Sequence, residues 1–243
     1  MSFVRSLLTY VLVSIYILFA GIIGLGIAIP FRWKGLLYEL GHAGAALALG
    51  TAGIRYRVVG RERLPPGVAV IFCSNHQSNV DPPVLFQALH RRLHILYKAE
   101  LSRIPILGTA MQIGGFVPID RDNRDAAFRA IERAADSVRT GNSFLIFPEG
   151  TRSRTGDLLP FKKGGFILAM KAQAPIVPVA VTGGRASMRK GSAIIHPVLV
   201  TVRIGQPIET CGMTMDDRDR LIALVRDRIT QLLREALADP AVG

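Results

Sequence analysis

The sequence contains little cysteine and is short of acidic residues, and each deficit limits what the protein can be. Its 243 residues include two cysteines, Cys73 and Cys211, which lie far apart and lack metal-ligand spacing. We therefore expect two free thiols in a reducing compartment, rather than a disulfide framework or a cysteine zinc site. Because 18 Asp+Glu face 30 Lys+Arg, the net charge of +12 predicts an anionic partner. Nucleic acid, a membrane surface and a phosphorylated substrate all fit that charge.

Signatures of nucleic-acid binding are missing as well. The chain shows no helix-turn-helix, zinc-finger or aromatic RNA-binding pattern, and no repeat or low-complexity linker. Hydrophobic residues make up 49% of the chain, and much of this excess falls within residues 1–50. The uneven distribution favours a membrane as the anionic partner and argues against nucleic acid.

Residues 7–29 form an uninterrupted uncharged stretch. At about 1.5 Å per residue, a helix of this length reaches across a bilayer core. Arg5 precedes the stretch and the basic and aromatic cluster at 32–34 follows it, as is typical of a segment held at a membrane interface. A cleaved signal peptide is an alternative, but the stretch is too long for the usual hydrophobic region and has no obvious small-x-small cleavage site. A buried helix of a soluble protein is a further alternative.

A second apolar stretch, residues 36–50, is too short to span a bilayer. Both stretches carry small residues at four-residue spacing, which lets two helix backbones approach closely. These residues are Ala20, Gly24 and Ala28 in the first stretch, and Gly41, Ala45, Ala46 and Gly50 in the second. We expect residues 1–50 to form a membrane-anchoring helical hairpin in or on one leaflet, followed by an α/β domain at 51–243. A true span is the alternative, and the flanking charges then leave the domain in the cytoplasm.

From residue 51 onward, short apolar runs alternate with polar helical segments. Strands are expected at 68–73, 94–97, 115–119, 143–147 and 176–182, with one or two more within 193–204. Amphipathic patterns predict helices at 125–139 and 216–237. Strands that alternate with helices indicate an α/β fold with a mostly parallel central sheet covered by helices.

The NHQSNVDPP segment places His76 and Asp81 directly after the first of these buried strands. Ligands of open α/β sheets bind at this carboxyl end of the strands. Asp81 and Pro82 are typical of a helix start, with Asp81 as N-cap, so the loop can fold back and bring the carboxylate to the imidazole. A carboxylate on one ring nitrogen fixes the tautomer and leaves the other nitrogen as a general base. The spacing alone is a weak motif, and a helix cap beside a surface histidine remains an alternative.

Other predicted strands end in residues that bind phosphate. The FPEGTRS segment brings Glu149, Gly150, Thr151 and Arg152 to the end of the fourth strand. Arginine can fork onto a phosphate, and the amides of a glycine-containing turn add donors. Further cations follow at three places, namely Lys98 after the second strand, Arg121 after the third, and Lys162 with Lys163 in FKKGG. Together the strand ends predict a pocket for a phosphorylated alcohol, although any single lysine can equally be a solvated charge.

These segments resemble the four motifs of the glycerolipid acyltransferase family that includes the 1-acyl-sn-glycerol-3-phosphate acyltransferases. The motifs are NHQSNVDP, the stretch from KAELSRIPILG to GGFVPIDR, FPEGTRS, and the Pro-centred IVPVAV strand at 176–181. Their order and spacing fit over roughly residues 55–210. One departure is Pro118, where many relatives carry another residue. The hairpin expected at the N-terminus also resembles the membrane-seated helix pair of this family.

The resemblance implies transfer of a fatty acyl group from acyl-CoA or acyl-carrier protein to the sn-2 hydroxyl of lysophosphatidic acid, giving phosphatidic acid. It implies His76 as the base and Asp81 as its partner, with the acceptor bound by Lys98, Arg121, Glu149, Gly150, Thr151 and Arg152. No metal and no cofactor beyond the acyl thioester co-substrate are expected. The expected partners are the lysophospholipid acceptor, the acyl thioester and the membrane. The expected location is the inner membrane, with the catalytic domain on its cytoplasmic face.

Direct attack by the bound alcohol is sufficient, because a thioester is already activated. Ser74 and Ser78 flank His76, but no G-x-S-x-G elbow surrounds either serine. Other acceptors, such as glycerol-3-phosphate or another lyso-lipid, stay open at this point. A lipid hydrolase would need an enzyme nucleophile or a metal-bound water. A non-catalytic, basic, membrane-binding protein would account for the charge and the apolar N-terminus alone.

Overall fold

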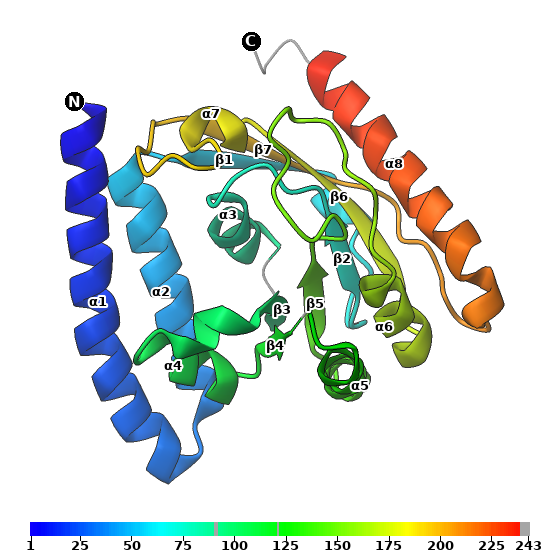
Figure 1. Cartoon of the computed structure of the whole chain (residues 1–243), viewed down its shortest axis with the longest axis horizontal. Coiled ribbons are helices and arrows are strands. Elements are labelled where there is room, and N and C mark those ends of the chain that lie inside the picture. The colour runs from blue at the N-terminus through cyan, green and yellow to red at the C-terminus, as the bar shows by residue number, and fades with distance from the viewer. Residues whose placement is uncertain (90–91, 121, 239–243) are drawn as a thin grey trace.

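A seven-stranded sheet forms the centre of the molecule, and helices cover both of its faces (Figure 1). The computed structural model describes residues 1–89, 92–120 and 122–238. The strands are β1 (Arg55–Val59), β2 (Ile71–Ser74), β3 (Leu93–Lys98), β4 (Val117–Ile119), β5 (Ser143–Ile146), β6 (Ile176–Thr182) and β7 (Leu199–Ile204). They lie in the order β1-β7-β6-β2-β5-β3-β4. Only β6 and β7 pair antiparallel, so the expected mostly parallel α/β fold is confirmed.

Eight helices surround the sheet within the described residues. They are α1 (Ser2–Phe31), α2 (Lys34–Ala52), α3 (Asp81–Ala88), α4 (Leu107–Ile113), α5 (Arg124–Arg139), α6 (Gly164–Ala172), α7 (Gly184–Ser187) and α8 (Arg218–Ala238). Successive strand residues point to opposite faces, so β2 contributes Phe72 to one core cluster and Ile71 and Cys73 to the other. Residues of α2 and α3 fill the first cluster, and residues of α5, α6 and α8 fill the second. The loops that follow β2 and β5 therefore start from strands that are packed on both faces of the sheet.

Two sequence expectations about strands need correction. β1 was missed because Arg55 and Arg57 interrupt its apolar pattern. The strand accommodates both at the sheet edge beside β7, where Arg55 is exposed and Arg57 Nε donates to Thr201 Oγ1. The run at 193–204, where one or two strands were expected, contains one, β7, which begins at Leu199. β2 comprises Ile71–Ser74, so it begins three residues later and ends one residue later than the expected 68–73.

The N-terminal helices α1 and α2 pack against each other as an antiparallel hairpin (Figure 1). On α1 the expected small residues do face α2, since an added Cβ at Gly24 would lie 2.5 Å from a methyl carbon of Leu40. On α2 the glycine that contacts α1 is not one of those expected. Gly44 is the glycine that contacts α1, at Tyr16, whereas Gly41 faces Phe86 of α3 and Gly50 meets nothing within 4 Å.

The outer face of α1 is an exposed apolar surface. Its most hydrophobic 18-residue window has a mean hydropathy of 2.5 and is only 11% buried. A core helix of a soluble protein would be mostly buried, and among the described residues α1 alone is long and apolar enough to cross a bilayer. The helix indicates that the protein associates with a membrane. Two polar contacts hold α1 to the domain, because Ile195 N–H donates to Ser6 Oγ and Tyr10 Oη–H donates to the Ala193 carbonyl.

His94 of β3 makes the free energy of unfolding depend on pH. Its pKa is lowered to about 4, because burial, with a smaller contribution from the charge of Lys34, outweighs a hydrogen bond to the Gly114 carbonyl that raises the pKa. The unfolded chain takes up this proton near pH 6.5. Because the folded pKa is depressed, the stabilising contribution is complete above pH 6.5 and is lost as the pH falls towards 4.

We expect the free energy of unfolding to fall by up to about 3 kcal/mol over that pH range through His94 alone. His94→Gln retains a donor for Gly114 but does not titrate, so urea denaturation of this variant should show a weaker pH dependence. His196 is exposed, and His196→Gln serves as the control with unchanged pH dependence. An equal slope in wild type and His94→Gln would contradict the assignment.

Candidate active site

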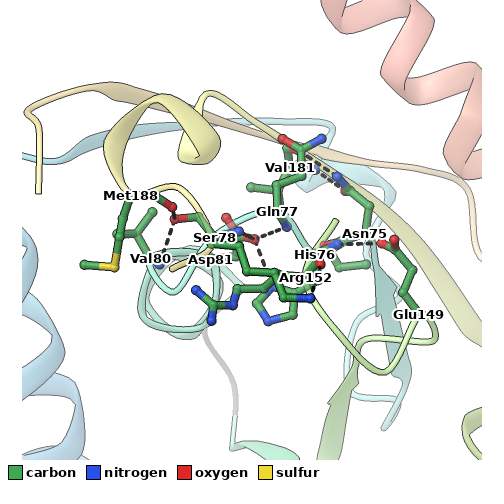
Figure 2. A network of polar contacts seen from close by, with 12 residues as sticks. Asn75, His76, Gln77, Ser78, Val80, Asp81, Glu149, Arg152, Val181 and Met188 are labelled. Atoms are coloured by element: carbon green, nitrogen blue, oxygen red, sulfur yellow. Dashed lines mark hydrogen bonds and ion pairs between the residues drawn. The ribbon is translucent and has the colours of Figure 1, made fainter. Parts of the chain in front are cut away.

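The loop after β2 brings His76 and Asp81 into contact, as the sequence predicted. His76 Nδ1 lies 3.0 Å from Asp81 Oδ2 (Figure 2). The same oxygen accepts the backbone N–H groups of Gln77 and Ser78, each at 2.7 Å. Asp81 has no exposed side-chain surface. These contacts hold the buried carboxylate in place, and a carboxylate in this position fixes the imidazole by accepting a hydrogen bond from Nδ1–H.

The expected role of Asp81 as a helix N-cap is wrong. α3 begins at Asp81 itself, and Val80 occupies the cap position without a side-chain cap bond. The Asp81 carboxylate instead folds back and closes the loop that precedes it. The Asp-Pro pattern correctly marked the start of a helix, but the side chain serves the histidine and two loop amides.

His76 presents its second ring nitrogen away from the carboxylate. The side chain is 15% exposed, and within the described residues no group is hydrogen-bonded to Nε2. The ring of Phe147, the last residue before Pro148 in the FPEGTRS segment, stacks on the imidazole with 4.1 Å between centroids. With Nδ1–H donated to Asp81, Nε2 carries a free lone pair, which is the arrangement of a general base.

Asn75 ties the loop after β2 to the neighbouring strand β6. Its amide donates to the Val181 carbonyl at 2.9 Å and accepts the Val181 N–H at 2.7 Å. Ser78 Oγ donates to the Met188 carbonyl at 2.8 Å, and Ser74 Oγ donates to the Asn75 carbonyl at 3.0 Å. Both serine hydroxyls are buried and donate to backbone carbonyls, so neither is placed as a nucleophile beside His76 (Figure 2).

Glu149 joins the loops that follow β2 and β5. One carboxylate oxygen accepts the His76 N–H at 2.8 Å and the other accepts the Leu159 N–H at 2.9 Å. The residue is 3% exposed. Burial raises the pKa of Glu149, and the two backbone N–H donors, with the charge of Arg226, partly offset that rise. The Ser153 N–H also donates to the His76 carbonyl at 2.8 Å. The backbone N–H and the backbone carbonyl of His76 therefore both bond to the loop that follows β5.

The turn at 150–153 lies beside this pair. Gly150 has a φ of +70°, and an added Cβ there would touch the Lys162 stem at 2.9 Å. Lys190 was not singled out from the sequence, yet its ammonium donates to Thr151 Oγ1 at 3.0 Å and to the Arg152 carbonyl at 3.2 Å. Arg152 is half-buried and directly precedes Ser153, whose N–H donates to the His76 carbonyl. The turn therefore gathers Lys162, Lys190 and Arg152 near the dyad.

One predicted residue is not brought into this cluster by the structure. Lys98 ends β3 and pairs with Glu100 at 2.6 Å, and both side chains are about half exposed. No contact joins Lys98 to His76 or to the 150–153 turn within the described part of the chain. Arg121 lies outside the described residues.

Several residues of the site escaped the sequence reasoning. Phe147, Asn75 and Lys190 contact residues that are remote in the chain, and no local pattern marks those contacts. Cys73, directly before the catalytic loop, is a buried free thiol, and Cys211 is an exposed free thiol, as expected. Burial raises the pKa of Cys73 above its ordinary value, so it remains a neutral thiol under the site.

Known proteins resemble this chain in sequence and in fold. The sequence model of the Acyltransferase family matches residues 55–182. A 1-acyl-sn-glycerol-3-phosphate acyltransferase of Limnanthes douglasii is 35% identical over 194 residues, which are 79% of this chain and 68% of that protein. The human 1-acyl-sn-glycerol-3-phosphate acyltransferase alpha is 34% identical over 192 residues, 79% of this chain and 68% of that protein.

A solved structure resembles nearly the whole chain. The crystal structure of the 1-acyl-sn-glycerophosphate (LPA) acyltransferase PlsC from Thermotoga maritima superposes with a TM-score of 0.84 and 25% sequence identity. The match covers 98% of this chain and 97% of that chain. Because it covers both ends of the sequence, it includes the hairpin as well as the sheet.

Proposed function

This chain belongs to the acyltransferase family, and from that membership we propose that it acylates the sn-2 hydroxyl of lysophosphatidic acid to give phosphatidic acid. The donor is an acyl thioester, either acyl-CoA or acyl-carrier protein. The observation that carries the proposal is the contact between His76 and the buried Asp81. Its relatives act as 1-acyl-sn-glycerol-3-phosphate acyltransferases, and the exposed apolar α1 brings this chain to the membrane, where such an acceptor lies.

The mechanism needs one base and no covalent enzyme intermediate. His76 Nε2 removes the acceptor hydroxyl proton while the hydroxyl oxygen attacks the thioester carbon. The new C–O bond forms, the C–S bond breaks, and the imidazolium returns the proton to the departing sulfur, so the products are an ester and a thiol. Asp81 stabilises the transient imidazolium without becoming protonated. Positioned proton transfer of this kind contributes about 10²–10⁴-fold to the rate.

Arg152 is the residue we assign to the acceptor phosphate, with Gly150 and Thr151 shaping the turn that presents it. Glu149 positions the two loops, because both of its oxygens accept backbone N–H groups. Lys98 can join the phosphate only if its exposed pair with Glu100 opens. Arg121 is assigned to the same phosphate by the resemblance alone.

Arg152→Ala should raise KM for lysophosphatidic acid by about tenfold or more, because a charged hydrogen bond to phosphate contributes about 1.5–3 kcal/mol. Its kcat should change much less, since the base remains. Steady-state assays with lysophosphatidic acid and with a neutral monoacylglycerol separate a phosphate effect from a general one. Arg154→Ala, which removes an exposed arginine of the same loop, is the matched control. An unchanged preference for the phosphorylated acceptor would remove Arg152 from the phosphate site.

The direct test of the reaction is product analysis with purified full-length protein in detergent or lipid vesicles. We expect phosphatidic acid from lysophosphatidic acid with at least one of the two donors offered separately, acyl-CoA and acyl-carrier protein. Glycerol-3-phosphate and another lysophospholipid should be poorer acceptors. Free fatty acid as the sole product, formed equally without acceptor, would identify a hydrolase and overturn the proposal.

We place the enzyme at the inner membrane with its catalytic domain on the cytoplasmic face. Basic residues flank α1 on both sides, at Arg5 and at 32–34, and cytoplasmic segments of membrane proteins carry such an excess. Acyl thioesters are also made in the cytoplasm. Protease accessibility of the domain in sealed inverted and right-side-out vesicles distinguishes the two faces.

A further inference from the structure

A cavity lies beside α8, which Figure 1 places on the side of the molecule away from the hairpin. It has a volume of about 740 Å³, within the range of ligand pockets. Its walls come from the loop at 155–158, from the end of β6 with α7, and from the C-terminal half of α8. Gln77, the neighbour of His76, also lines it, and the Gln77 side chain donates to the Gly156 carbonyl at 3.1 Å. The cavity therefore begins next to the catalytic dyad and leads away from it.

The cavity is strongly cationic. Arg185, Arg189, Arg226 and Arg234 line it, against one carboxylate, Asp157. Arg226 is engaged, since it donates to the carbonyls of Leu158 and Leu159 at 2.9 and 2.6 Å. Arg185 donates through Nε to the Arg154 carbonyl, which leaves its terminal nitrogens available.

Arg189 and Arg234 have no side-chain partner among the described residues, and both are exposed. They come from segments far apart in the sequence, yet both face this one cavity. Like charges around a concave surface repel one another and focus a positive potential into it, which favours an anionic ligand. Planar guanidinium groups are suited to phosphate in particular.

The rest of the lining is apolar. Leu158, Leu233 and Leu237 lie among the arginines, and a phosphate alone would leave this surface unused. A ligand with phosphate groups at one end and a flat heterocycle at the other satisfies both parts of the lining. The nucleotide of coenzyme A has that composition, and its long pantetheine arm would allow the thioester to reach a base that does not itself line the cavity.

The position of the cavity agrees with a water-soluble donor. Figure 1 places α1 and α2 at one side of the molecule and α8 at the other, with the sheet between them. A lipid acceptor would arrive from the hairpin side, and α8 lies at the opposite side of the molecule. We propose that this cavity, which we call the α7–α8 pocket, binds the adenosine 3′,5′-bisphosphate end of acyl-CoA, with Arg189 and Arg234 as phosphate ligands. The inference rests on the proposed function, because it assigns a site to the thioester donor of that reaction.

The test separates nucleotide binding from acyl transfer. Adenosine 3′,5′-bisphosphate contains no acyl group, so its affinity for the full-length protein, measured by isothermal titration calorimetry in detergent, does not depend on turnover. The double variant Arg189→Ala/Arg234→Ala should bind it at least tenfold more weakly than wild type. The double variant Arg129→Ala/Arg228→Ala removes the same charge from exposed positions outside the pocket, and it should bind like wild type.

Steady-state kinetics supply the second arm. The pocket variant should raise KM for acyl-CoA at least tenfold and leave KM for lysophosphatidic acid and turnover of an acyl-pantetheine thioester unchanged. Nucleotide affinity unchanged in the pocket variant overturns the inference. If the pocket variant raises KM for the lipid acceptor, the inference is overturned and the arginines are assigned to that acceptor. If the wild-type protein does not bind the nucleotide and the pocket variant raises KM for acyl-carrier protein, the inference is also overturned and the arginines are assigned to that carrier. If the pocket variant loses nucleotide binding but the wild-type protein shows no acyl transfer, the nucleotide site is supported and the proposed function is rejected.

Discussion

His76→Ala is expected to lower kcat by about 10²–10⁴-fold, the contribution of a positioned general base, with little change in KM for either substrate. The fold should survive, because the contacts that hold this position are made by its backbone. Glu149 accepts the His76 N–H and the His76 carbonyl accepts the Ser153 N–H, and alanine keeps both groups. Initial rates of phosphatidic acid formation and urea denaturation measure the two properties on the same preparation.

Two further variants sharpen this prediction. Asp81→Asn should lower kcat in the same direction, because an amide no longer fixes the required tautomer. The His76→Ala/Asp81→Asn double variant should be no slower than His76→Ala, since the carboxylate acts through the imidazole and the effects are not additive. His196→Ala removes an exposed histidine and controls for general loss of activity. Near-normal turnover by His76→Ala would exclude His76 as the base.

Gly184→Ala is expected to lower kcat by about 10²-fold, although Gly184 contacts no substrate. The residue opens α7, where alanine is ordinarily the better helix former. An added methyl group would overlap Asp81 Oδ1. The carboxylate cannot swing aside, because its other oxygen is held by His76 and by the Gln77 and Ser78 amides. Either the dyad or α7 must shift, and a misplacement of about 1 Å at a catalytic group costs about this factor.

The control for Gly184→Ala is Gly50→Ala on α2, where an added methyl group meets nothing within 4 Å. That variant should keep full turnover and equal or greater thermal stability. For Gly184→Ala, KM for both substrates should stay within about twofold of wild type, while overpacking lowers the free energy of unfolding by about 1–3 kcal/mol. Wild-type kcat in a folded Gly184→Ala protein would show that Asp81 tolerates displacement.

The sequence predicted the dyad because its chemistry is local. A buried strand followed by histidine and, five residues later, by Asp-Pro is sufficient to place both side chains in one loop. The parallel sheet was equally accessible, because apolar runs alternated with amphipathic helices. β1 was not, since Arg55 and Arg57 are tolerated there only because the strand lies at the edge beside β7, a neighbour more than a hundred residues away.

The same limit explains what was missed at the site. Glu149 was expected to bind the acceptor, but its carboxylate meets the backbone of His76 and Leu159. Gly184 limits the space around Asp81, and Lys190 holds the 150–153 turn. Each contact joins segments that only the folded sheet brings together, so residue type and spacing could indicate the chemistry of a loop but not the residues that support it.

The exposed apolar face of α1 determines how the kinetics of this enzyme must be described. An enzyme and an acceptor that both partition into a lipid phase meet in two dimensions, so the relevant acceptor concentration is its mole fraction in the surface. Adding inert phospholipid at constant total acceptor would slow the reaction by surface dilution, whereas adding more vesicles of the same composition would not. Shortening or charging the outer face of α1 would convert this two-dimensional encounter into an ordinary bulk collision.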